Sequence, residues 1–304
     1  MIKLIISILM LAVPLVEDVQ SSNLYFVGDI MLTRGVEHTL KENNKGWDFL
    51  LSPIEDDLHK ADFLFGNLES MISDKGYDMG GLYSFRADPL SMEVLTGANF
   101  SAVSVANNHS FDYTVNALTD TMLRLKEEGV GYVGGGFTKE EAHSPFFYTL
   151  PNNTSIGVLG YTSVGSSGWQ AQPHVPGIAW MDIHRLEALR EDIENVDADI
   201  VIVSIHFGEE YAEEPSKEQR IIGESAIDFG ADLVVGHHPH VLQPLEKYKD
   251  GWIAWSLGNF IFDQSFSEET MTGAVLKAKV RKGRITGVEL VKTKQNSLYQ
   301  VEWK

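Results

Sequence analysis

The chain has 304 residues, of which 43% are hydrophobic, and a formal net charge of −19 at pH 7. These values are typical of a folded globular protein with one large domain or two small ones, and the acidic balance argues against a nucleic-acid binder, whose affinity depends on Lys and Arg. The absence of cysteine excludes disulfides, thiolate metal ligands, a cysteine nucleophile and a bacterial lipoprotein anchor.

The N-terminus carries an apolar run that begins after Lys3 and extends to Val16. Its length matches the hydrophobic region of a signal peptide and is short for a membrane span, which needs roughly 20 residues. We therefore expect residues 1–21 to be a signal peptide or a short N-terminal anchor. The protein is then exported, and either secreted or held at the cell surface. A buried first strand or helix of the fold is the alternative interpretation.

The first half of the chain alternates apolar runs with helical patterns. Strands are predicted at residues 24–27, 61–65, 102–106 and 130–133, and helices at residues 47–58, 89–97 and 113–128. A proline opens the second of these helices, and a glycine follows the last. The stretch 71–82 is rich in glycine and polar residues, which predicts a loop.

The second half continues this alternation and ends in a hairpin. Ser216 and Gln219 have the spacing of a capping box and predict where one helix begins. The predicted elements are a hairpin at 146–150 and 155–160, a long loop at 161–179, helices at 182–196 and 216–229, strands at 200–205, 233–235 and 251–256, and a closing hairpin at 272–280 and 285–293. No linker or repeat interrupts them, so we expect residues 22–304 to form one domain.

The densest group of potential metal ligands follows the strand predicted at 233–235. Gly236 turns the chain, and His237, His238 and His240 come directly after it. Two imidazoles separated by one residue can bind one metal ion when the backbone is extended, and imidazole binds zinc, iron or manganese in its neutral form. A surface loop that is merely rich in histidine is the alternative.

Ligand-type side chains also follow four other predicted strands: Asp29, Glu69, Asn108 with His109, and His206. Because the ends of strands in a mixed or parallel sheet can meet at one edge, we expect these side chains to lie close together. Carboxylate, carboxamide and imidazole ligands in one place suit a hydrolytic centre with two metal ions. For Asp29 alone, capping of a following helix is the alternative.

Six segments that contain these residues resemble, in the same order, motifs of the CapA family of poly-γ-glutamate capsule proteins; they are residues 28–32, 67–69, 106–112, 206–211, 236–244 and 256–263. The resemblance extends over about residues 24–265. It implies a fold similar to calcineurin-like metallophosphoesterases: an α/β fold in the form of a four-layer α/β sandwich, with mixed sheets flanked by helices. It further implies a centre of two divalent metal ions, which are Mn, Zn or Fe.

The resemblance also assigns roles residue by residue. The implied metal ligands are Asp29, Glu69 as the bridging carboxylate, Asn108, His206, His238 and His240, with His237 as the alternative to His238. His109 corresponds to the histidine that contacts the scissile phosphate or the leaving group, and a core histidine is the alternative. Asp112 is the second catalytic candidate, for which capping of the following helix is the alternative.

Several positions depart from the family pattern or have an open role. Met31 stands where metallophosphoesterases usually have a histidine, two residues after the first aspartate, which puts one metal site in question. Phe207 replaces a common tryptophan, which we interpret as a packing change. Arg86 is either a surface charge or a contact for an anion. Asn259 and Asp263 either fix their loop or support the ligands.

Together these features predict an exported CapA-like protein of capsule or poly-γ-glutamate biosynthesis with a dinuclear, metal-dependent hydrolase site. The expected partners are poly-γ-glutamate, another anionic polymer or a phosphoester as substrate, and a membrane synthase complex; nucleic acid is not expected. The alternative is a non-catalytic component of polymer assembly or transport, with a structural or vestigial metal site. A phosphodiesterase unrelated to polymer follows from fold analogy alone.

Overall fold

The computed structural model describes residues 20–304. The predicted signal peptide or anchor therefore lies outside the described residues, apart from its last two positions. Within the described range, no helix is both long enough and apolar enough to cross a bilayer.

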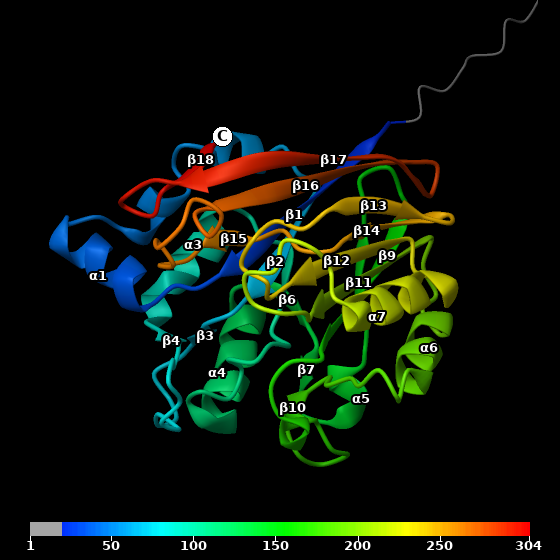
Figure 1. Cartoon of the computed structure of the whole chain (residues 1–304), viewed down its shortest axis with the longest axis horizontal. Helices are drawn as coiled ribbons and strands as arrows, with labels where there is room; N and C mark the ends of the chain where they lie inside the picture. The colour runs from blue at the N-terminus through cyan, green and yellow to red at the C-terminus, as the bar shows by residue number, and fades with distance from the viewer. Residues whose placement is uncertain (1–19) are drawn as a thin grey trace, which may run out of the picture.

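The first of two large sheets contains the N-terminal strand and the closing hairpin (Figure 1). Its order is β18-β17-β16-β1-β2-β5-β6, and β15 pairs with β1. The strands β1, β2, β5, β6 and β15 run parallel, whereas β16, β17 and β18 pair in antiparallel fashion. Their bounds are β1 Ser22–Ile30, β2 Phe63–Leu68, β5 Ala102–Ser104, β6 Gly131–Val133, β15 Asn259–Ile261, β16 Thr272–Arg281, β17 Arg284–Gln295 and β18 Val301–Trp303.

The second sheet has the order β13-β14-β12-β11-β9-β8. Its four central strands are parallel, and an antiparallel strand closes each edge. Their bounds are β8 Phe146–Thr149, β9 Ser155–Thr162, β11 Ile200–His206, β12 Leu233–His237, β13 Leu245–Tyr248 and β14 Gly251–Ala254. The predicted hairpins, β8 with β9 and β16 with β17, are both confirmed.

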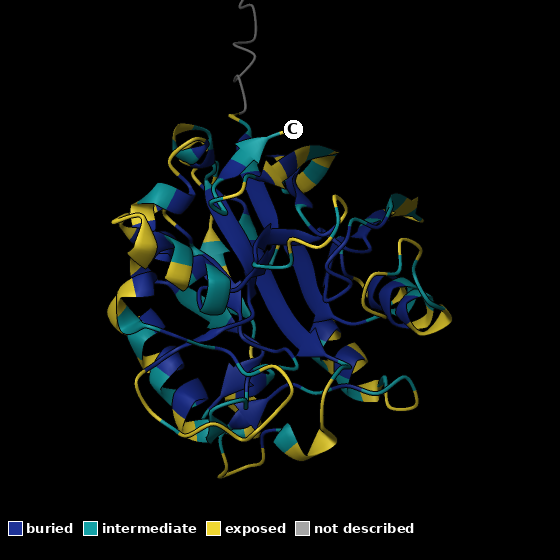
Figure 2. Ribbon diagram, turned by 60° about the vertical axis from the view of Figure 1, so that its left-hand side comes forward, coloured by how far each residue is buried: buried dark blue, intermediate teal, exposed yellow. Residues whose placement is uncertain are grey.

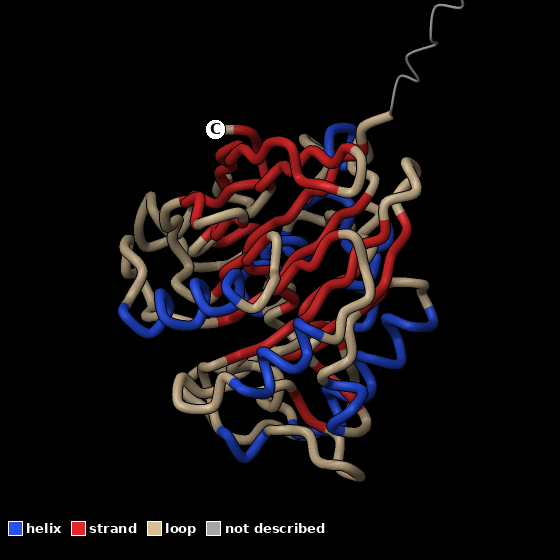
Figure 3. The backbone as a smooth tube through the Cα atoms, turned by 90° about the vertical axis from the view of Figure 1, so that its right-hand side faces the viewer, coloured by secondary structure: helices blue, strands red, loops and turns tan. Residues whose placement is uncertain are grey.

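Helices cover the outer face of each sheet. The first sheet packs against α1 Arg34–Glu42, the 3₁₀ helix η1 Trp47–Leu50, α2 Glu55–Leu58, α3 Met92–Gly97 and α4 Thr114–Glu127, and the second against α6 Glu187–Glu194 and α7 Lys217–Asp228. Shorter elements lie in the connections: β3 Met71–Ile72, β4 Arg86–Ala87, η2 Pro89–Ser91, β7 Gly135–Gly136, α5 Lys139–Ala142, η3 Ser167–Trp169 and β10 Gly177–Ile178. Figure 3 shows the strands as tilted stacks with the helices outside them.

Alternation along β1 shows why the sheets stack in this way. Leu24 and Phe26 pack between the sheets with Ile202 of β11, whereas Tyr25 and Val27 face the helices. Successive side chains of a strand point to opposite faces, so a strand that is apolar throughout must be covered on both sides. Figure 2 shows these buried strands through the centre of the molecule and the exposed faces of the helices outside them. The four-layer α/β sandwich is confirmed.

Two predicted helices differ from the structure for local reasons. The helix expected at 47–58 is divided into η1 and α2, because Pro53 lacks an N–H group and disfavours helical geometry at the residue before it. The helix expected at 182–196 begins only at Glu187. At the start of the expected helix, the Asp182 side chain accepts a hydrogen bond from the backbone N–H of His184 at 2.7 Å and stabilises a turn instead. The sequence prediction also missed α1, directly after β1.

Candidate metal centre

The strands β1 and β2 of the first sheet and β11 and β12 of the second, whose positions Figure 1 shows, carry ligand-type side chains at their ends. In the first sheet, Asp29 of β1 lies beside Asn67 of β2. In the second sheet, His206 of β11 lies beside His237 of β12. The backbone N–H of His238 donates to Oδ2 of Asp29 at 3.3 Å, so the two sheets meet at this point. The expected convergence of strand ends therefore occurs.

Two fully buried carboxylates, Asp29 and Glu69, form the middle of the group. Nδ1 of His240 lies 3.3 Å from Oδ2 of Asp29, and Nε2 of the same ring lies 3.6 Å from Oε1 of Glu69. Nδ1 of His237 lies 3.5 Å from the other oxygen of Asp29. One imidazole thus spans the two carboxylates that the family resemblance makes metal ligands.

The second side of the group contains Asn108, His206 and His238. Nε2 of His206 lies 2.7 Å from Oδ1 of Asn108, and the rings of His206 and His238 are 4.8 Å apart. The structure therefore brings together all six residues that the sequence predicted as metal ligands, and it places His237 beside Asp29 rather than beside Asn108.

Asn67 holds the carboxylates in place, although the sequence analysis did not include it in the site. Its Nδ2 atom donates to Oδ1 of Asp29 at 2.8 Å and to Oε2 of Glu69 at 3.2 Å. Asn107 in turn donates to Oδ1 of Asn67 at 3.2 Å. A fully buried asparagine inside an apolar strand requires such partners, and its occurrence in β2 was the available signal.

Asn259 fixes the ring of His240. Its Nδ2 atom donates to Gln264 and to the carbonyl of Thr270, both at 3.0 Å, so its Oδ1 atom faces Nδ1 of His240 at 2.9 Å. This acceptor favours a proton on Nδ1 and directs Nε2 toward Glu69. Orientation of a ligand histidine through its other nitrogen is a common feature of metal sites.

Four buried polar atoms in this group have no hydrogen-bond partner: Oε1 of Glu69, both ring nitrogens of His237, and Nδ1 of His238. Buried polar atoms in proteins are nearly always paired, so an accumulation of unpaired ligand atoms needs an explanation. Ligand atoms of Asp29, Glu69 and His240 lie within 4.8 Å of one another, as do those of Glu210, His238 and His240. Imidazole and carboxylate donors of this kind fit divalent Mn, Fe or Zn.

Burial keeps the imidazoles in the form that binds metal. It lowers the pKa of His206 well below the ordinary value, with a further contribution from His238. Burial likewise lowers the pKa of His238 to about 3, with a contribution from His240. Both rings are therefore neutral near pH 7, as metal ligation requires.

The pKa values of the two buried carboxylates, Glu69 and Asp29, are shifted in opposite directions. Burial and the charge of Asp29 raise the pKa of Glu69 well above its usual range. Burial would also raise the pKa of Asp29, but the adjacent imidazoles of His237 and His240 outweigh it and hold the pKa well below the usual range. Two adjacent buried carboxylates repel each other, and a divalent cation between them relieves this repulsion.

The backbone around the histidines is strained. His238 and His240 have φ angles of 97° and 59°, in the left-handed region that favours glycine. Such residues cost roughly 1–3 kcal/mol each and persist where the surrounding structure enforces them, often at functional sites. This backbone places the ring of His240 beside Asp29 and Glu69, and that of His238 beside His206.

His109 and Asp112 form a pair at the edge of the group. Nδ1 of His109 lies 2.7 Å from Oδ2 of Asp112, and Nε2 lies 3.8 Å from Oε1 of Glu69. The backbone N–H of Phe85 donates to the same oxygen of Asp112 at 2.8 Å, and its ring stacks on His109 at 3.9 Å. Asp112 does not cap the following helix, whose N-cap is Tyr113, so that alternative is wrong.

The remaining predicted residues stabilise neighbouring loops. Arg86 donates to the carbonyls of Lys75 and Gly76 and lies 4.2 Å from the ring centroid of Tyr113, so its contacts hold the 71–85 loop. Asp263 accepts from Nε of Arg34 at 3.0 Å and from the backbone of residue 35 at 2.9 Å, which fixes the start of α1. Neither has a direct contact with the carboxylates among the described interactions.

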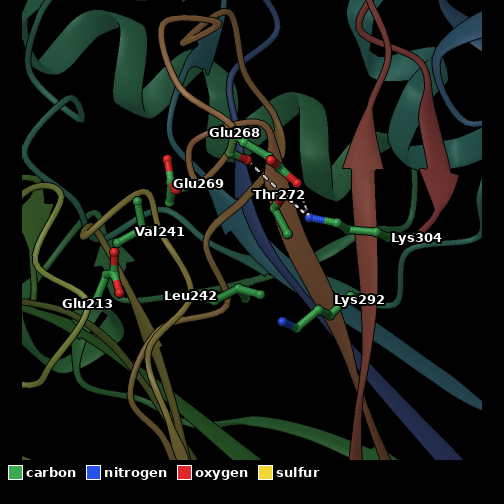
Figure 4. Close-up of a pocket in the computed structure, with 8 residues that line it drawn as sticks. All are labelled: Glu213, Val241, Leu242, Glu268, Glu269, Thr272, Lys292 and Lys304. Atoms are coloured by element: carbon green, nitrogen blue, oxygen red, sulfur yellow. Dashed lines mark hydrogen bonds and ion pairs between the residues drawn. The ribbon is translucent and has the colours of Figure 1, made fainter.

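We call residues 237–240 the histidine loop. A separate cleft of about 340 Å³ begins directly after this loop, at Val241. Nζ of Lys304 donates to Glu268 at 2.8 Å and to Thr272 at 3.2 Å across it (Figure 4). The lining residues are Glu213, Val241, Leu242, Glu268, Glu269, Thr272, Lys292 and Lys304, and none is a predicted metal ligand. The cleft therefore adjoins the centre without being part of it.

The same arrangement of two stacked sheets covered by helices occurs in solved structures. A hypothetical protein from Thermus thermophilus superposes with a TM-score of 0.56 at 15% identity, covering 90% of this chain and all of that one. A 5′-nucleotidase candidate from Staphylococcus aureus superposes with a TM-score of 0.52 at 14% identity, covering 93% of this chain and 56% of that one. At these identities the likeness concerns the fold.

The chain belongs to the family described as Bacterial capsule synthesis protein PGA_cap, whose model matches residues 23–264. It is 34% identical over 268 residues to the PGA biosynthesis protein CapA of Bacillus subtilis, covering 88% of this chain and 69% of that protein. It is 32% identical to the capsule biosynthesis protein CapA of Bacillus anthracis, covering 84% of this chain and 63% of the relative. The predicted family resemblance is confirmed, and the chain spans about two thirds of these relatives.

Proposed function

We propose that this chain is a metal-dependent hydrolase of capsule biosynthesis that acts on poly-γ-glutamate, on another anionic polymer or on a phosphoester. The observation that carries the proposal is the group of unpaired, buried ligand atoms on Glu69, His237 and His238 beside the His109–Asp112 pair. Relatives named for the biosynthesis of PGA and of capsule support the polymer as substrate class.

The six predicted ligands would hold two divalent cations, with Glu69 between them. Such ions supply Lewis-acid polarisation of a carbonyl or phosphoryl oxygen and a more acidic bound water. His206 and His238 stay neutral and Asn67 orients the two carboxylates, so the chain keeps its ligands in a fixed geometry before metal binds. Preorganised ligands of this kind are what a catalytic centre requires.

His109 is the candidate general acid. The carboxylate of Asp112 holds Nδ1, which leaves Nε2 directed toward the centre at 3.8 Å from Glu69. A proton at Nε2 can pass to the leaving oxygen of a phosphoester or to the leaving amine of a γ-glutamyl amide, both of which need one. Asp112 orients the ring and stabilises the protonated form, as the aspartate of a catalytic triad does.

The experiment that tests this proposal uses the purified full chain, stripped with chelator and reloaded with Mn²⁺. Bis(p-nitrophenyl) phosphate and poly-γ-glutamate are the substrates, and released p-nitrophenolate and polymer length are the readouts. Metal-dependent shortening of the polymer supports the proposal in full, and turnover of the phosphodiester alone supports a phosphoesterase. A chain that binds metal and turns over neither substrate supports the non-catalytic role in polymer assembly instead.

We also propose that the protein is exported, because its N-terminal apolar run has the length of a signal-peptide core. N-terminal sequencing of protein from the native host is expected to begin near Ser22. Recovery of soluble cytoplasmic protein that begins at Met1 would contradict export.

A further inference from the structure

Met31 leaves the first metal position short of a ligand. Its side chain is fully buried, and its sulfur accepts a hydrogen bond from the backbone of Thr33 at 3.4 Å. A thioether is also a poor ligand for hard divalent ions. The ion held by Asp29, Glu69 and His240 therefore has three protein ligands from these residues, and a fourth must come from elsewhere in the chain or from water.

Glu210 belongs to a second group of potential ligands, which shares His240 with the first. One of its carboxylate oxygens and one ring nitrogen each of His238 and His240 lie within 4.8 Å of one another. Ligand atoms held at roughly 2.1 Å from one ion are at most roughly 4.2 Å apart. Because Glu210 is exposed, a small movement of its side chain is enough to close this gap.

The backbone that carries Glu210 is fixed to the histidine loop. The N–H of Tyr211 donates to the carbonyl of Pro239 at 2.8 Å, so residue 210 stays opposite His238 and His240. Gly208 makes the required turn with a φ of 99°, and a Cβ there would lie 2.5 Å from the side chain of Gln219. The position of Glu210 is thus set by the fold rather than by a mobile loop.

An independent observation indicates that a ligand belongs here. Nδ1 of His238 has no hydrogen-bond partner, and water cannot readily supply one because only 5% of the residue is exposed. Such an atom is costly unless a bound group satisfies it. The neighbouring Glu209 has the same charge and is also exposed, but it belongs to neither group of potential ligands among the described residues.

We propose that Glu210 is a ligand of the metal centre, bound from the solvent side, which completes the ligand set that Met31 leaves short. This inference rests on the proposed metal centre. Every other member of the two ligand groups is buried, so Glu210 is the member that can move away without disturbing the core. It therefore controls how readily the more weakly held ion exchanges with solvent.

The test compares the full-length wild type with the variants Glu210→Gln and Glu209→Gln. Each protein is stripped with chelator, titrated with Mn²⁺ by calorimetry, and analysed for bound metal after gel filtration. We expect Glu210→Gln to lower the affinity for the weaker ion about tenfold or more, while Glu209→Gln binds as the wild type does. Both variants lose the same charge, so the difference between them isolates ligation.

Ionic strength provides a second readout that does not depend on activity. A through-space effect of one exposed charge is largely screened in 1 M salt, whereas the loss of a ligand persists there. Equal titrations of Glu210→Gln and wild type, or a difference that disappears in 1 M salt, would overturn the assignment of Glu210 alone. A wild type that takes up no divalent metal would overturn the metal centre and this inference together.

Discussion

The backbone N–H of His238 donates a hydrogen bond to Oδ2 of Asp29 at 3.3 Å, although 209 residues separate the two in sequence. The carboxylate that the family resemblance makes the first metal ligand thus also fixes the histidine loop. Metal binding and the conformation of this loop share one buried group.

Asp29→Asn is expected to weaken both functions of this carboxylate. The amide has one acceptor oxygen for two donors, Asn67 and the His238 backbone, so one buried N–H loses its partner at a cost of about 1–3 kcal/mol. Urea denaturation of the metal-free proteins measures this loss, and calorimetry with Mn²⁺ is expected to show at most one weak ion. Asp62→Asn is the control, because Asp62 accepts a backbone hydrogen bond at the opposite end of β1. Equal metal binding by Asp29→Asn and wild type would contradict the role of Asp29.

Glu69→Gln is expected to reduce the centre to one weakly bound ion and to abolish hydrolysis. A bridging carboxylate offsets the charge of two adjacent cations, which an amide cannot do. In the wild type the ion next to Met31 has fewer protein ligands, so we expect two unequal affinities, with one ion lost on dialysis. Metal titration and metal analysis check both points, with the exposed Glu93→Gln as control. Two equally tight ions in the wild type would refute the asymmetry, and full occupancy in Glu69→Gln would refute the bridge.

The stability of the metal-free protein is expected to fall as pH decreases from about 6.5 toward 3. Burial lowers the pKa of His238 to about 3 in the folded chain, whereas the unfolded chain takes up the proton near the ordinary value of 6.5. Between these values the unfolded state binds more protons, so acidification favours unfolding, and the contribution of His238 is complete only above pH 6.5. The full contribution of His238 to the free energy of unfolding is roughly 5 kcal/mol.

Denaturation of the metal-free wild type and His238→Asn from pH 7 to pH 4 measures this contribution. Asparagine tolerates the left-handed backbone of this position, and the variant is expected to lose stability less steeply on acidification. The difference between the two curves separates His238 from Glu69, whose raised pKa acts in the opposite direction. The exposed His38→Asn is the control, and parallel curves for all three proteins would contradict the prediction.

Asp112→Asn is expected to reduce turnover about 10²- to 10⁴-fold without loss of metal. An amide that donates to Nδ1 of His109 leaves a neutral ring and removes the negative charge that stabilises the protonated ring, so His109 becomes a much weaker acid. Steady-state rates and metal analysis of the loaded proteins separate the two effects. Because the two residues act as one unit, the double variant with His109→Ala should be no slower than His109→Ala alone. Additive losses would show that Asp112 acts independently of His109.

The main elements and the ligand positions could be predicted from sequence because each ligand follows an apolar run. Asp29 and His206 come at the ends of strands that are buried on both faces, and such ends meet at one edge of a sheet. Asn67 and Glu210 could not be identified in this way. The role of Asn67 depends on which strand lies beside β2, and that of Glu210 on the path of the chain after β11.

Local chemistry accounts for the other differences. Pro53 interrupts a periodic apolar pattern that alone predicts one helix, and the Asp182 side chain accepts from the backbone N–H of His184 and so stabilises a turn before the second helix. Helix α1 buries only Val36 and Leu40, so its pattern in the sequence is weak. In the first two cases a local interaction outweighed the periodicity, and in α1 few apolar residues mark the helix.

The predicted ligands are divided between the two sheets: Asp29, Glu69 and Asn108 lie at or after the ends of strands of the first, and His206, His238 and His240 at or after those of the second. An ion bound by these residues would therefore connect the two sheets, which the unfolded chain does not hold together. Ligands that bind only the folded state stabilise it by about 2.7 kcal/mol when present at 100 times their Kd. The concentration of divalent metal where the chain folds would then set its resistance to unfolding and proteolysis. A shortage of metal would shorten the lifetime of the protein whether or not the centre is catalytic.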